Sequence, residues 1–101
     1  MIAETILEQM GGHGFVSITG SKNFIDLGNG LQMSLARNKT SANRLKVILD
    51  EATDTYTMCF YRQSVTKNFG IKVKEIAKYE GVYFDMHQSI FTQVTGLYTR
   101  F

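Results

Sequence analysis

Residues 44–65 read RLKVILDEATDTYTMCFYRQSV, two alternating segments joined by a short polar turn. Apolar side chains occupy every second position at Leu45, Val47 and Leu49 of Arg44–Asp50, and again at Tyr56, Met58 and Phe60 of Thr55–Val65. Such alternation is typical of strands with one buried face. Ala52-Thr53-Asp54 supplies the turn. This stretch predicts an antiparallel pair inside a sheet.

Further strands are predicted before this pair, at Phe15–Thr19, Phe24–Leu27 and Leu31–Leu35. Gly28-Asn29-Gly30 predicts a type I′ hairpin, because Asn and Gly tolerate the positive φ that this turn requires. Arg37–Asn43 has no apolar periodicity, so we expect an exposed loop there.

A last strand is predicted after the pair. Thr66-Lys67-Asn68 indicates a turn, and Phe69, Ile71 and Val73 then alternate with polar or small residues. This strand can extend towards Tyr79.

Two amphipathic helices are expected at the ends, at Ala3–Met10 and from about Val82 to Thr95. Gly11-Gly12 and Gly96 stand where helix-terminating glycines belong. We therefore predict one α+β domain over residues 1–101. It has an antiparallel meander of five or six strands, with an N-terminal and a C-terminal helix packed on one face.

Composition excludes several classes of protein. The 44% hydrophobic and 20% charged residues are ordinary for a globular domain, and no apolar run approaches the ~20 residues of a membrane span. Glu4 and Glu8 do not fit the basic start of a signal peptide. Cys59 is the single cysteine, so no disulfide forms within the chain. We expect a cytoplasmic protein with no membrane partner.

Positive charge is concentrated in the middle of the chain. Nine basic and four acidic residues lie between Arg37 and Lys78, a net charge of +5 against +2 for the whole chain. The loop Arg37–Arg44 adds hydroxyl and amide groups that can bind phosphate. The candidate nucleic-acid-binding residues are Arg37, Lys39, Arg44, Lys46, Lys72 and Lys74, with Arg62 and the stacking ring of Tyr61 able to extend them. The alternative is a solvated loop and sheet face.

Aromatic residues fall into two groups. Tyr56, Phe60, Phe69 and Phe91 lie on apolar faces and are expected in the core. A second group surrounds the C-terminal helix and is the candidate protein-interaction surface: Tyr79, Tyr83, Phe84 and Tyr98.

Catalytic, metal and cofactor signals are weak. Cys59 lies within a predicted strand, where nothing lowers a thiol pKa. On a helix, Asp85 and His87 point in different directions, so we expect solvent-facing polar residues rather than metal ligands. Neither Gly11–Gly14 nor Thr19–Lys22 has the strand-to-helix context of a phosphate loop. We expect no enzyme activity, metal or cofactor.

Several segments resemble a family of small proteins of unknown function encoded by bacteriophages, prophages and other mobile elements. They are ILEQMGG at 6–12, FVSITGSKNF at 15–24, EGVY at 80–83 and TGLYT at 95–99. The family reads ILEQLGG, FIAMTGAKNF, EGVY and TGLYT, so Met10 replaces leucine and Val16-Ser17-Ile18 replaces Ile-Ala-Met. The resemblance implies an origin in a phage or mobile element and a bacterial cytoplasmic setting. It transfers no site.

The expected function is that of a non-enzymatic accessory protein, which binds a protein partner or assembles with itself. The alternative is a nucleic-acid-binding protein that uses the basic loop and a sheet face.

Overall fold

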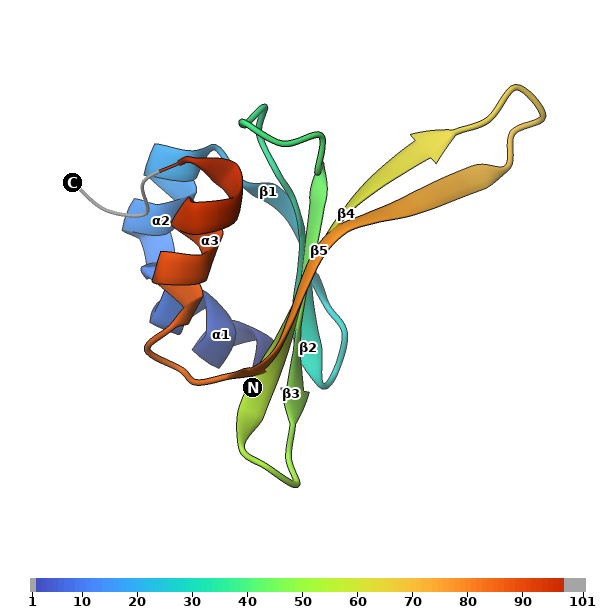
Figure 1. Cartoon of the computed structure of the whole chain (residues 1–101). Coiled ribbons are helices and arrows are strands. Elements are labelled where there is room, and N and C mark those ends of the chain that lie inside the picture. Colours follow the sequence, from blue (N-terminus) through green and yellow to red (C-terminus); the bar gives the residue numbers. More distant parts are fainter. Residues whose placement is uncertain (1, 98–101) are drawn as a thin grey trace.

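Five strands form one antiparallel sheet in the order of the sequence (Figure 1). This arrangement is seen in a computed structural model that describes residues 2–97. The strands are β1 (Lys22–Asp26), β2 (Gly30–Ser34), β3 (Arg44–Asp50), β4 (Thr55–Val65) and β5 (Ile71–Val82). The helices are α1 (Ile2–Met10), α2 (Gly12–Thr19) and α3 (His87–Thr95).

All three helices lie against the same face of the sheet, and the other face is open (Figure 1). The α+β fold, the five-stranded meander and the helices on one face are therefore confirmed. Among residues 2–97, no helix has the length and apolar character needed to span a bilayer.

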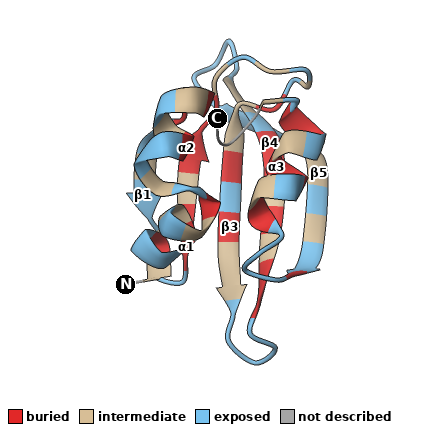
Figure 2. Ribbon diagram, turned by 90° about the vertical axis from the view of Figure 1, so that its left-hand side faces the viewer, coloured by how far each residue is buried: buried red, intermediate tan, exposed pale blue. Residues whose placement is uncertain are grey.

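The central pair β3–β4 has the predicted bounds. Leu45 faces Phe60, and Val47 faces Met58. All four side chains are fully buried, while the residues between them face the open side. Figure 2 shows this alternation along β3.

The β1–β2 hairpin is also confirmed, but its turn is not type I′. Of the three turn residues Gly28, Asn29 and Gly30, only Gly28 has a positive φ, of 83°. Gly30 is needed for space instead, because a Cβ there would clash with the carbonyl oxygen of Val47.

The strand predicted at Phe15–Thr19 is wrong, because these residues belong to α2. Phe15 and Thr19 are one helical turn apart and both are buried. The Thr19 hydroxyl donates to the Phe15 carbonyl at 2.7 Å, and Gly20 ends the helix in the left-handed conformation. The short apolar run fits either period, and packing against the sheet selects the helix.

The C-terminal helix begins at His87, five residues later than predicted. Residues to Val82 continue β5, and Val82 is buried opposite Tyr56. Phe91 of α3 then packs its ring edge-on against Phe15 at 5.0 Å and at a tilt against Phe60 at 6.3 Å. These three rings join α2, α3 and β4 in one core.

The prediction that Phe69 is a core residue is wrong. Phe69 is 91% exposed, because it lies at the end of a hairpin that projects from the body (Figure 1). Ile71 and Val73 alternate as predicted, yet both are exposed as well.

Candidate binding surface

A two-stranded arm extends beyond the body of the sheet. We define the arm as residues 62–74, the outer halves of β4 and β5 with their turn. β3 begins at Arg44, which pairs with Tyr61, so among residues 2–97 only β5 pairs with β4 beyond this point. The side chain of Asn43 braces the base of the arm: its Nδ2 donates to the Gln63 carbonyl and its Oδ1 accepts from the Gln63 N–H.

The strand register divides the arm into two unlike faces. Directly paired residues of an antiparallel ladder lie on the same face. Arg62 pairs with Lys74 and Ser64 with Lys72, which makes one face basic. Gln63 pairs with Val73 and Val65 with Ile71, which makes the other face apolar. Val65, Ile71 and Val73 are 73%, 67% and 59% exposed.

The tip of the arm holds Phe69 in an unfavourable conformation. The Thr66 N–H donates to the Gly70 carbonyl at 2.8 Å, and the Phe69 N–H donates to the Thr66 carbonyl. Phe69 has a φ of 60°, which is uncommon for a bulky residue and costs about 1 kcal/mol. A strained backbone carrying an exposed aromatic ring is a feature found at functional sites.

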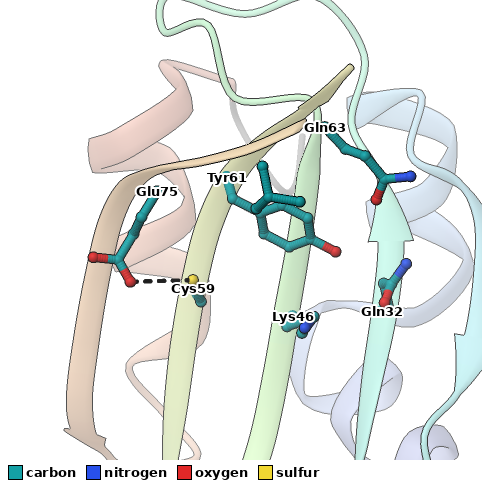
Figure 3. Close-up of a pocket in the computed structure, with 7 residues that line it drawn as sticks. Gln32, Lys46, Cys59, Tyr61, Gln63 and Glu75 are labelled. Atoms are coloured by element: carbon teal, nitrogen blue, oxygen red, sulfur yellow. Dashed lines mark hydrogen bonds between the residues drawn. The ribbon is translucent and has the colours of Figure 1, made fainter. Parts of the chain in front are cut away.

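The apolar face of the arm continues into the open face of the sheet. There a shallow hollow of about 260 Å³ spans β2 to β5 (Figure 3). Its lining residues are Gln32, Lys46, Cys59, Tyr61, Gln63, Val73 and Glu75. The hollow therefore begins where the arm leaves the body.

The chemistry of this hollow does not favour nucleophilic catalysis. The Cys59 thiol donates to Oε1 of Glu75 at 3.7 Å (Figure 3). Burial, followed by the negative charge of Glu75, raises the pKa of Cys59, so the thiol form is stabilised.

Tyr61 cannot serve as a stacking platform for bases, as the sequence suggested. Its side chain is buried at 4% exposure, and Lys46 Nζ lies 5.4 Å from its ring centroid. Burial also raises the pKa of the Tyr61 hydroxyl.

The six predicted nucleic-acid-binding residues do not form one surface. Lys72 and Lys74 lie on the basic face of the arm together with Arg62. Arg44 and Lys46 share a face, as predicted, but it is the open face of the sheet. Arg37 and Lys39 lie in the β2–β3 loop beside the base of the arm, where Arg62 Nη1 donates to the Ser41 carbonyl at 3.2 Å.

Many polar groups of the β2–β3 loop form hydrogen bonds within the loop itself. Asn38 Nδ2 donates to the carbonyls of Ala36 and Ala42, and Asn38 Oδ1 accepts from the N–H and hydroxyl of Thr40. The Lys39 stem lies beside Gly96 at the C-terminus of α3, where a positive charge is favourable. The phosphate-binding donors expected from this loop are thus mostly engaged.

The predicted protein-interaction residues are also divided. Tyr79 is half-buried and packs edge-on against Phe60 at 6.5 Å. Tyr83 and Phe84 are 58% and 63% exposed in the β5–α3 connection, at the other end of β5 from the arm. Tyr98 lies outside the described residues.

Sequence reasoning missed the apolar face of the arm. Val65, Ile71 and Val73 alternate in the same way as core residues, so periodicity alone assigns them to the core. The signal that could have revealed this face is the length of the strands: β4 has eleven residues and β5 has twelve, whereas β3 has seven. Two long strands beside a shorter one must project beyond it.

The histidines lie apart from this surface. His13 is exposed on α2, while His87 is fully buried at the first position of α3, so the expectation that His87 faces solvent is wrong. Asp85 is exposed before the helix begins. Within residues 2–97, no three His, Cys, Asp or Glu side chains are grouped to hold a metal ion.

No protein-family model, curated protein or solved structure matches this chain.

Proposed function

We propose that this protein is a non-catalytic binding protein that associates with a second copy of itself through the apolar face of the arm. The observation that carries the proposal is the exposure of Val65, Ile71 and Val73 on one face of a projecting ribbon, with Phe69 at its tip. An isolated two-stranded hairpin is only marginally stable in water, so a partner that covers this face would also stabilise the arm.

The area is consistent with a second copy. The side chains of Val65, Ile71 and Val73, together with Phe69 at the tip, expose on the order of 500 Å². This area is at the upper end of the range for the largest exposed apolar patch on a monomeric protein. Two such patches packed about a two-fold axis would bury about 1,000 Å² in total, the lower limit for a specific interface. A two-fold interface uses the same patch twice, so the apolar face of one arm is complementary to that of the other.

The edge of β5 is less suited to association than its face. Lys72, Lys74 and Lys78 lie along this edge strand, and the pairing with β4 is irregular between Phe60 and Tyr61. Lysines and bulges are devices that prevent strand addition at an edge. We therefore expect the two arms to pack face to face.

The test is the mass of the protein as a function of concentration, measured by sedimentation velocity. We expect a reversible monomer–dimer equilibrium for the native chain. The double substitution Val65→Thr and Ile71→Thr should weaken dimerisation at least tenfold, because it removes apolar contacts while retaining β-branched side chains. Ile25→Thr is the control, since Ile25 is exposed on the same side of the sheet but on β1, far from the arm.

Phe69→Gly adds a second, independent variant. Glycine relieves the positive φ, so the free energy of unfolding should rise by about 1 kcal/mol while dimerisation weakens. A native chain that stays monomeric at all concentrations would refute the proposal. The proposal would also be refuted if both arm variants still formed the dimer while the double substitution Tyr83→Ser and Phe84→Ser abolished it.

The absence of catalysis is part of this proposal. It is supported by the raised pKa of Cys59 and by the separation of His13 and His87 from the hollow. The resemblance to phage and mobile-element proteins supports an accessory role in a bacterial cytoplasm.

A further inference from the structure

We propose that the basic face of the arm binds double-stranded DNA, with the ribbon lying in the major groove and its cations on the phosphates. The cations are Arg62, Lys72 and Lys74 on this face and Lys67 in the turn at the tip. The inference does not depend on self-association, because Val65, Ile71 and Val73 lie on the opposite face of the ribbon.

The charge of the arm is high and uncompensated. Residues 55–74 contain these four basic residues and no aspartate or glutamate, although the whole chain carries only +2. Within residues 2–97 the one ion pair is Lys78–Glu80, on the body of β5. The four cations of the arm therefore face solvent without a carboxylate partner, which is the arrangement that releases counterions when phosphates bind.

The shape of the arm favours a groove of duplex DNA over a single strand. The major groove admits a two-stranded ribbon. Binding of single strands relies instead on aromatic side chains on which successive bases stack. On this protein Tyr61 is buried and Phe69 is the one aromatic residue of the arm. Polar and charged side chains on one face, with backbone exposed at the edge of β5, suit phosphate contacts along a groove.

The base of the arm can add to this interface. A polar groove of about 430 Å³ lies between Arg62 and the β2–β3 loop, and Arg37 lines it. The bond from Arg62 to the Ser41 carbonyl holds the guanidinium beside this groove. A DNA backbone that extends past the base of the arm would therefore lie close to Arg37, which could contact a further phosphate.

The experiment is fluorescence anisotropy with a labelled mixed-sequence duplex of about 20 base pairs, two helical turns. Affinity should fall about a hundredfold between about 50 and 200 mM salt, as four phosphate contacts require. The triple substitution Arg62→Gln, Lys72→Gln and Lys74→Gln should weaken binding at least tenfold at the lower salt. It should also reduce the slope of log affinity against log salt by about 3.

The matched control is Lys22→Gln, Lys46→Gln and Lys78→Gln, which removes the same charge from outside the arm. Binding should be largely retained in this variant. Equal losses in both triple variants would overturn the proposal, since only net charge would then matter. Tighter binding of a single strand of the same sequence, or affinity that does not change with salt, would overturn it as well. Circular dichroism melts confirm that both variants fold.

Discussion

At the scale of single residues, His87 is a fully buried imidazole with one unpaired nitrogen. Its Nε2 lies 3.1 Å from Oε1 of Gln9, and its ring packs edge-on against Tyr56 at 4.6 Å. Nδ1 has no hydrogen-bond partner. Burial lowers the pKa of His87 to about 4, because the charged ring would lose its hydration.

This pKa makes stability depend on pH. The unfolded chain takes up a proton near pH 6.5 and the folded chain only near pH 4, so stability is lost as pH falls through that window. We expect His87 to reduce the free energy of unfolding by about 2 kcal/mol between about pH 7.5 and pH 5. Urea titrations at the two pH values measure this change.

Two variants isolate the contribution of this ring. His87→Phe should remove the pH dependence, because it keeps an aromatic ring beside Tyr56 but cannot be protonated. His13→Gln, at an exposed position of α2, should retain it. An unchanged pH profile in His87→Phe would show that another group is responsible.

At the scale of elements, β2 and β3 approach closely because Gly30 lacks a side chain. Gly30 pairs with Ile48, and an added Cβ would meet both the Val47 carbonyl oxygen and the Ile48 side chain. The sequence marks this glycine only as a turn residue, while the packing of the strand shows its second role.

Gly30→Ala should therefore be strongly destabilising. We expect a loss of about 3 kcal/mol in the free energy of unfolding, because backbone atoms must move to relieve the contact. Gly14→Ala is the control: a Cβ there meets nothing within 4 Å, and helix propensity predicts a gain of up to about 1 kcal/mol. Thermal melts of both variants measure these changes in stability. A small loss of stability in Gly30→Ala would contradict the prediction, because it would show that β2 and β3 can move apart at little cost.

At the scale of the whole molecule, a two-layer body carries an arm that shares little of its core. The chain measures 39 × 33 × 21 Å, and its body consists of one layer of helices on one sheet, from which the arm projects (Figure 1). Outside the body, the arm is held by the β4–β5 ladder and by the contacts of Asn43 and Ser41 at its base. Its stability should therefore differ from that of the body.

Hydrogen exchange should resolve these two parts. In dilute protein, amides of residues 63–73 should exchange at least tenfold faster than those of β3, because the arm can open locally. At concentrations where the dimer forms, arm amides should become protected while Val47 in β3 does not change. Equal protection of the arm and β3 in dilute protein would contradict this picture.

Local sequence patterns determined much of the fold. The bounds of β3 and β4, the β1–β2 hairpin and the α+β class follow from period-two alternation and turn chemistry, which act over a few residues. Tertiary structure alone decided the rest. It made residues 12–19 a helix, buried His87, and placed Val65, Phe69 and Ile71 outside the core. The physical reason is that periodicity shows which residues share a face, whereas burial depends on whether another element covers that face. Beyond Tyr61, no part of the chain described here covers the arm.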